Sequence, residues 1–311
     1  DLNFNLMYSK RSMIDVIQTY PKMREIRRRM MNGYLHGSSY SPIGLNELRR
    51  RVPALTGGGP DSRLPIIGGM VHKEAAVCRH DGVAWGYARA ASSQGVEIHQ
   101  HTEVKQLLRD SKGAIKGVET NRGIILADKV AVVVAGHTTT ITETVGLRLP
   151  VKSFNLSAFV SEPVKPLIDV IVNCPDLGVY LNQSDKGELV IGGAPDSGQS
   201  FRRDIKQLVF EDAVVTMLEL FPAFQRLKLL RQWGGVLDIA HDATPIISKT
   251  DISGLFVSCG WWGGFKAVPA GGLTLAHLIA TGKPHPLAEP FILDRFKHLD
   301  FIVESGTTTA R

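Results

Sequence analysis

The chain has 311 residues, of which 43% are hydrophobic and 21% are charged, a composition typical of a globular protein that buries a large core. Its formal net charge is +6, and much of the excess lies in two basic segments, residues 22–29 and 49–51. Neither segment has the aromatic and glycine pattern of an RNA-binding motif, and apolar residues recur at helical spacing within the first. We therefore expect no nucleic-acid binding. A solvated helix face or a docking surface for an acidic partner is the favoured interpretation.

The cysteines and histidines indicate neither a disulfide framework nor a metal site. Cys78, Cys174 and Cys259 are far apart in the sequence, as is typical of reduced, buried thiols. His99 and His101 lie close together, but no cysteine or carboxylate cluster accompanies them. No apolar run approaches the roughly 20 residues of a membrane span. We expect a soluble cytoplasmic protein that holds no metal.

The first third of the chain is predicted to be largely helical. Residues 9–29 form one helix in this prediction, kinked or divided at Pro21, because an apolar stripe runs along them at helical spacing. Its members are Met13, Val16, Ile17, Tyr20, Met23, Ile26 and Met30. A short helix over residues 45–51 and a strand over residues 64–70 follow. Next comes a helix from His80 to about Ser93, which Gln94 and Gly95 close.

The remaining patterns predict strands, with two further helices. We expect the central strands at 96–99, 102–108, 115–120, 124–126 and 129–136, the last being apolar, β-branched and typical of a buried parallel strand. From residue 150 onward the pattern is that of an antiparallel sheet, with a strand at 156–160 and a hairpin joining 178–183 to 188–193. A helix over 205–220, capped by Asp204, follows.

A glycine-rich loop follows a buried strand near the end of the chain. Residues 254–260 form the strand, and a helix then carries Leu273, Ala276, His277 and Ala280 at helical spacing. Gly260, Gly263 and Gly264 let backbone N–H groups touch a ligand, so this segment is typical of a site for a flat or phosphorylated molecule. An ordinary strand-to-helix turn is the alternative.

Two runs of sequence resemble a known family. Residues 79–90, beginning Arg-His-Asp, are similar to the segment of the heterotetrameric sarcosine oxidase β subunit whose histidine carries covalent FMN. Residues 263–266, Gly-Gly-Phe-Lys, resemble the C-terminal flavin loop of the D-amino-acid-oxidase-like FAD-dependent amine oxidoreductases. The resemblance extends along the chain in the same order and is densest at 77–136, 157–166, 178–193 and 231–290. Trp261 and Trp262 replace a three-residue Trp-Gly-Thr-like stretch, which changes the pocket wall.

The resemblance implies an α/β fold with an α+β insertion. A glutathione-reductase-like FAD domain would be assembled from discontinuous pieces, with an antiparallel-sheet substrate or interface domain between them. The expected division is 1–76, a helical and substrate or interface region; 77–147, the middle FAD segment; 148–250, the substrate domain; 251–283, the C-terminal FAD segment; and 284–311, a tail.

The resemblance also implies the chemistry. A sarcosine-like secondary amine acid would give a hydride to FAD, and the electrons would pass to FMN on His80 and then to oxygen, in a complex with α, γ and δ subunits. Lys266, a compact positive charge, would hold the substrate carboxylate. The other implied cofactor contacts are Val104, Ala135, Gly136, Gly260, Gly263, Gly264, Phe265 and Lys266 itself.

One expected motif is absent from the 311 residues. No G-x-G-x-x-G, the usual cradle for a dinucleotide pyrophosphate, follows an apolar strand. We therefore expect a fragment or a truncated product that lacks the N-terminal dinucleotide-binding segment. Two other functions stay open. One is a non-catalytic subunit that acts as an assembly module, and the other is a single-chain FAD amino-acid dehydrogenase without FMN on His80.

Overall fold

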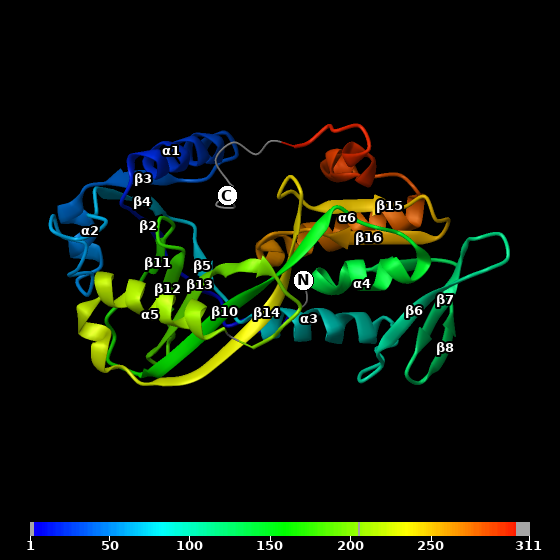
Figure 1. Cartoon of the computed structure of the whole chain (residues 1–311), viewed down its shortest axis with the longest axis horizontal. Coiled ribbons are helices and arrows are strands. Elements are labelled where there is room, and N and C mark those ends of the chain that lie inside the picture. Colours follow the sequence, from blue (N-terminus) through cyan, green and yellow to red (C-terminus); the bar gives the residue numbers. More distant parts are fainter. Residues whose placement is uncertain (1–2, 205, 303–311) are drawn as a thin grey trace.

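An eight-stranded mixed sheet occupies one half of the molecule, and two three-stranded sheets lie in the other half (Figure 1). The computed structural model describes residues 3–204 and 206–302. The strand order of the large sheet is β14-β10-β13-β12-β11-β2-β4-β3. Its strands are β2 (Met13–Ile17), β3 (Tyr40–Ile43), β4 (Gly68–His72), β10 (Val151–Pro163), β11 (Ile171–Cys174), β12 (Val179–Gln183), β13 (Glu188–Gln199) and β14 (Leu229–Ala240).

Helices cover both faces of this sheet. Successive residues of a strand point to opposite faces, so neighbouring residues of β4 identify the two sides. Val71 packs in the large core that includes α5 (Gln207–Leu220), whereas Met70 packs with Ile26 of α1 (Tyr20–Leu35). The hairpin of β12 and β13 is confirmed, and the predicted strand at 156–160 forms the centre of the much longer β10.

The predicted helix over residues 9–29 is wrong in its first half. Residues 13–17 form β2, which pairs with β11 on one side and β4 on the other. Helix α1 begins only at Tyr20, with Thr19 as its N-cap and Pro21 in its first turn. A central strand that is buried on both faces has a nearly continuous run of apolar residues. Some apolar residues of β2 therefore also fell at the spacing expected for one face of a helix.

The sheet β15-β16-β9 (Ile246–Lys249, Leu255–Cys259 and Val130–Val132) positions the glycine-rich loop. Strands β16 and β9 are parallel, and α6 (Val268–Thr281) follows β16. Both predicted elements exist, but the stripe that begins at Leu273 lies on the exposed side of α6, and Leu275 and Leu278 are buried instead. Helix α6 is apolar on all sides, so sequence alone could not separate its faces.

The third sheet is a meander of β6 (Val104–Arg109), β7 (Ile115–Thr120) and β8 (Gly123–Leu126). It follows α3 (His80–Ser93), which has the bounds that the sequence predicts. The remaining β-strands and α-helices are β1 (Ser9–Lys10), α2 (Leu45–Arg51), β5 (Ala76–Val77) and α4 (Thr138–Thr142). Among the described helices, none has the length and apolar character that a bilayer crossing requires.

Four further predictions need correction. Residues 96–99 form no strand, because no described strand lies beside them to share hydrogen bonds. The strand predicted at 64–70 lies at 68–72, and the one predicted at 129–136 ends at Val132, ahead of a turn. Helix α5 has Lys206 as its N-cap, while the side chain of Asp204 pairs with Arg202. Residue 205, the predicted first residue of that helix, lies outside the described residues.

Candidate functional site

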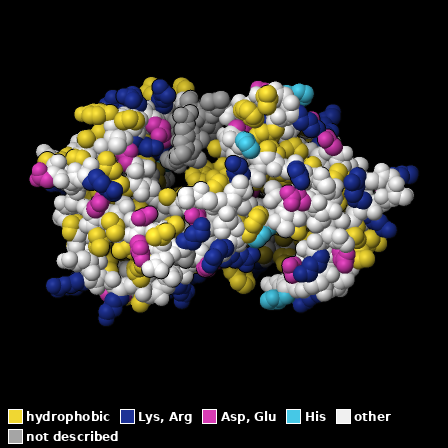
Figure 2. Space-filling model, viewed as in Figure 1, with side chains coloured by type: hydrophobic (Ala, Val, Ile, Leu, Met, Phe, Trp, Pro, Cys, Tyr) yellow, Lys and Arg dark blue, Asp and Glu magenta, His cyan; other side chains and the backbone are white. Residues whose placement is uncertain are grey.

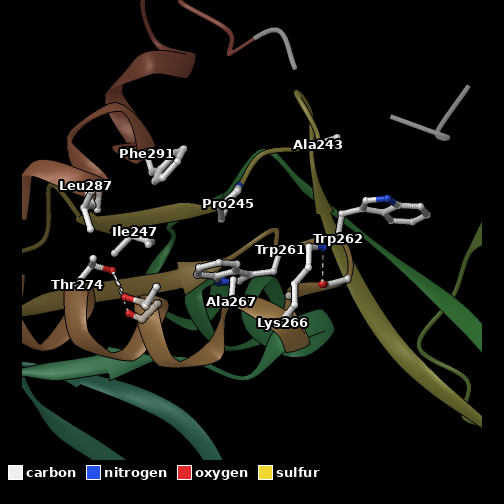
Figure 3. Close-up of a pocket in the computed structure, with 15 residues that line it drawn as sticks. Ala243, Pro245, Ile247, Trp261, Trp262, Lys266, Ala267, Thr274, Leu287 and Phe291 are labelled. Atoms are coloured by element: carbon white, nitrogen blue, oxygen red, sulfur yellow. Dashed lines mark hydrogen bonds between the residues drawn. The ribbon is translucent and has the colours of Figure 1, made fainter. Parts of the chain in front are cut away.

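Two pockets adjoin at the loop formed by residues 260–264. The first, which we call the strand-end pocket, has a volume of about 460 Å³ and reaches from Val133 and Ala135 to the end of β14. The second, the Lys266 pocket, has a volume of about 340 Å³ and is closed by Pro245, Leu287 and Phe291 (Figure 3). Their shared wall consists of Trp261, Trp262, Gly263, Gly264 and Gly271.

The strand-end pocket follows from the topology of the small sheet. Strands β9 and β16 are parallel, so their carboxyl ends meet at one edge, and this edge is where open α/β sheets bind ligands. A short 3-10 helix, η4 (Gly264–Ala267), connects the loop to α6, and the first N–H groups of η4 have no partners within it. The helix N-terminus therefore offers N–H donors and a partial positive charge to a polar ligand edge.

Glycine is required where the loop approaches Trp261. A Cβ atom on Gly264 would lie 2.7 Å from the Cβ of Trp261, and one on Gly271 would lie 2.8 Å from its ring. Gly260 and Gly263 have φ values of +74° and +70°, which favour glycine. The Trp261 ring thus packs against the first turn of α6. Its Nε1 donates a hydrogen bond of 3.0 Å to Oγ of Ser258 on β16. Trp262 points the opposite way in Figure 3.

Lys266 stands at the edge of its pocket with no acidic partner. Its side chain is exposed, and its Nζ donates only a long hydrogen bond of 3.3 Å to the Gly263 carbonyl (Figure 3). Within residues 3–204 and 206–302, no carboxylate lies within ion-pair distance of this ammonium group. The charge is therefore available to a ligand carboxylate, beside walls that are mainly apolar.

Asp238 is a site residue that the sequence analysis missed. It lies near the end of β14, lines the strand-end pocket and is only 4% exposed. Its Oδ2 accepts a hydrogen bond of 2.5 Å from the N–H of Gly260, and its backbone oxygen accepts one of 3.1 Å from Trp262. Burial raises the pKa of this carboxyl, and the N–H groups of Gly260 and Trp261 oppose the shift only in part. An acidic residue inside the apolar second half of this strand, residues 233–240, was the available signal.

We predict that Asp238→Asn removes a pH dependence of stability. Because the folded pKa is raised, the folded chain binds the proton more tightly than the unfolded chain does. The parent should therefore gain unfolding free energy, relative to the variant, as the pH falls from neutral towards the ordinary carboxyl pKa of about 4. Urea unfolding of both proteins across this range measures the difference. Asp169→Asn, at an exposed carboxylate without an ion pair, should show no such trend.

The structure brings some of the predicted site residues together and separates others. Ala135, Gly263, Gly264 and Phe265 line the strand-end pocket, and Ala135 has a φ of +46°, an uncommon conformation for a residue with a side chain. Gly136 is buried behind Ala135.

Four of the predicted residues line neither of the two pockets. A Cβ on Gly136 would lie 2.2 Å from Val236 Cγ1, which explains the glycine. Val104, at the start of β6, and His80, exposed at the start of α3, line neither pocket. Gly260 turns the chain out of β16, with its N–H on Asp238.

Comparison with known proteins places the chain in a family. A family model described as FAD dependent oxidoreductase matches residues 1–278. Sarcosine oxidase subunit beta of Rhodobacter capsulatus is 44% identical over 306 residues, which cover 98% of this chain and 73% of that protein. The chain belongs to the FAD-dependent oxidoreductases of the sarcosine oxidase β subunit type. The corresponding subunit of Rhizobium meliloti is 40% identical over 98% of this chain and 73% of its own length.

Two solved structures have the same fold. L-proline dehydrogenase from P. horikoshii superposes with a TM-score of 0.84 at 21% identity, covering 97% of this chain and 80% of that one. Glycine oxidase from Geobacillus kaustophilus gives a TM-score of 0.81 at 21% identity, with 94% and 76% coverage. The predicted fold class and the family resemblance are confirmed, and the protein is a flavin-dependent amine oxidoreductase.

Proposed function

We propose that this chain binds the flavin ring of FAD at the strand-end pocket and oxidises a secondary amine acid similar to sarcosine. When bound, FAD supplies the electron acceptor for the amine. The pocket residues fit such a group, because the pocket is mainly apolar and glycines let the backbone approach a flat ring. The start of η4, the 3-10 helix that leads into α6, offers N–H donors to a polar ring edge.

The observation that supports the substrate class best is the unpaired ammonium group of Lys266. Lys266 lies in the short 3-10 helix η4, two residues beyond Gly264, which lines the strand-end pocket. A carboxylate held there would orient an amino acid while its amine end stays free to face the flavin. In this proposal Trp261 and the apolar pocket walls exclude water from the bound substrate.

We further propose that His80 carries FMN covalently. His80 is the first residue of α3 and is exposed, so its ring is accessible at a helix N-terminus that favours anionic groups. Asp81 forms its ion pair with the neighbouring Arg79. Electrons would pass from FAD to this FMN and then to oxygen.

The expected result is a flavin adduct on the tryptic peptide that begins at His80. Protein purified with its partner subunits should show this adduct by mass spectrometry, and His80→Asn should abolish it while FAD stays bound. His99→Asn, at another exposed histidine, is the matched control and should keep the adduct. An unmodified peptide from an active complex would contradict the assignment.

We propose that the chain is divided into two structural units, as the family resemblance implies. Residues 77–147 and 251–283 form the FAD-binding unit, and residues 1–76 and 148–250 form the substrate and interface unit. The joining of β2, β3 and β4 to β10–β14 in one sheet supports the second grouping. We propose partners of the α, γ and δ type and a cytoplasmic location, which the unpaired cysteines support.

Anaerobic titration of the purified complex with sarcosine tests the proposal. Bleaching of the flavin absorbance is expected, and its recovery on admitting air tests oxygen as acceptor. A colourless complex that stays assembled would favour a non-catalytic assembly module. A yellow protein that loses all its flavin on acid precipitation would favour a single-chain FAD dehydrogenase.

A further inference from the structure

The outer face of α1 is an exposed surface that neither pocket nor core uses. We call it the α1 face, and its members share one side of the helix: Tyr20, Arg24, Arg27, Arg28, Met31, Tyr34 and Leu35. Three of its large side chains are mostly in solvent, with exposed fractions of 72% for Tyr20, 60% for Met31 and 82% for Leu35. Hydrophobic and basic side chains accordingly lie side by side along the upper edge over α1 (Figure 2).

The positive charge of this face is not compensated locally. Residues 20–35 contain a single acidic residue, Glu25, and its carboxylate pairs with Lys22 away from the face. In the part of the chain that the structure describes, Arg24, Arg27 and Arg28 have no carboxylate within ion-pair distance. Arg29 differs, because it turns inward to the buried Asp15.

The composition of the face is that of a protein interface. Tyrosine, methionine and arginine are enriched at interfaces, whereas lysine, glutamate and aspartate are depleted. The α1 face contains two tyrosines, one methionine, one leucine and three arginines, and it has no lysine or acidic residue. A helix face that only meets water carries mixed charges and few large apolar groups. Uncompensated arginines around exposed apolar side chains therefore call for a partner with carboxylates around an apolar centre.

The position of α1 separates this surface from the cofactor site. Helix α1 packs on β2, β3 and β4, at the edge of the large sheet opposite to β14 (Figure 1). The strand-end pocket, in contrast, lies at the end of β14. A partner can therefore cover α1 without closing either pocket.

We propose that the α1 face docks an acidic patch of another subunit of the oxidase complex. Carboxylates of the partner would face Arg24, Arg27 and Arg28, and its apolar residues would pack around Met31 and Leu35. The proposal rests on the multi-subunit assembly proposed above and does not depend on the substrate. It concerns a separate protein, because the α1 face has the composition of an interface and its arginines lack carboxylate partners among the described residues.

Two variants of the complete subunit, co-expressed with its partner subunits, test the proposal. The first is Arg24→Glu/Arg27→Glu/Arg28→Glu, and the second is Met31→Ser/Leu35→Ser. Sedimentation velocity at several NaCl concentrations measures assembly. We expect each variant to assemble about tenfold or more weakly than the parent, with the charge variant also losing most of the salt dependence.

The control reverses three exposed, unpaired cations elsewhere: Lys112→Glu/Arg226→Glu/Lys283→Glu. It makes the same change in net charge and should assemble as the parent does. The altered side chains of α1 are exposed, so both test variants should fold and keep their flavin. If a test variant loses assembly while the freed subunit still oxidises sarcosine normally, the docking surface is supported. If the complex assembles normally but does not oxidise sarcosine, only the proposed function is refuted.

Several outcomes would overturn the proposal. Unchanged assembly of both variants would show that α1 lies outside the subunit interfaces. A dimer of this subunit alone, lost in the same variants, would assign the face to a second copy. Variant-sensitive binding to vesicles of anionic phospholipid would assign it to a membrane surface. Equally slow amide exchange of α1 in the free and assembled subunit would show that its own chain covers it.

Discussion

Replacing Lys266 by methionine should weaken substrate binding about 10- to 150-fold, because one charge-assisted contact contributes about 1.5–3 kcal/mol. Methionine keeps much of the side-chain volume and removes the positive charge. The Lys266 ammonium makes one long hydrogen bond to Gly263 and no ion pair with the described residues, so little structure depends on it. Flavin content should therefore stay near that of the parent.

Competition by a small carboxylate separates this role from a structural one. Acetate should inhibit the parent enzyme by occupying the carboxylate position, and it should bind the Lys266→Met variant much more weakly. Lys283→Met, at an exposed lysine beyond the end of α6, is the matched control and should leave the kinetics unchanged. Equal acetate binding by the parent and the Lys266→Met variant would refute the substrate-anchor role.

The sequence predicted best those elements whose signals are local. Helix α3 and helix α2 have the predicted bounds, and the hairpin of β12 and β13 turns at a glycine-containing loop. The glycine-rich loop was also recognisable, since few other reasons account for so many glycines between a strand and a helix. These features depend on neighbours within a few residues, and sequence patterns report such neighbours directly.

Features that depend on distant neighbours could not be predicted in this way. Strand β2 has β11 on one side and β4 on the other, and only that burial shows why its apolar run is not helical. Asp238 reaches the Gly260 N–H across 22 residues of sequence. The charge and apolar content of α1 were visible in the sequence, but which arginine turns inward to Asp15 was not.

Arg295 and Asp242 form a buried ion pair that joins the C-terminal segment to the wall of the Lys266 pocket. The guanidinium is bidentate, with Nε 2.8 Å from Oδ2 and Nη2 3.0 Å from Oδ1 of Asp242, and both side chains are 3% exposed. Nη2 also donates to the Thr244 carbonyl at 2.8 Å. The pair thereby fixes the turn that presents Ala243 and Pro245 to the pocket.

Arg295→Met should lower the free energy of unfolding by about 3–5 kcal/mol, because it leaves the buried carboxylate of Asp242 without its partner. Burial acts to raise the pKa of Asp242, but the hydrogen bonds and charge of Arg295 outweigh it and lower that pKa in the folded parent. The parent therefore has this stabilisation at neutral pH and loses it as the pH falls below about 4. Without the guanidinium, burial raises the pKa of Asp242, and protonation at low pH removes the unfavourable free energy of burying its unpaired charge.

The difference in the free energy of unfolding between the parent and Arg295→Met should consequently decrease as the solution is acidified. Urea unfolding of both proteins at pH values on both sides of about 4 measures this difference. The double variant Asp242→Leu/Arg295→Met removes both charges and should be less destabilised than Arg295→Met alone, since no buried charge is left unpaired. Lys297→Met is the matched control, because its ammonium pairs with Asp251 at the surface and contributes little. The opposite outcome is a decrease in the free energy of unfolding of Arg295→Met that does not change with pH and equals that of the double variant. It would show that packing of the Arg295 side chain, including its contact with the Phe296 ring, stabilises this segment and that its charge does not.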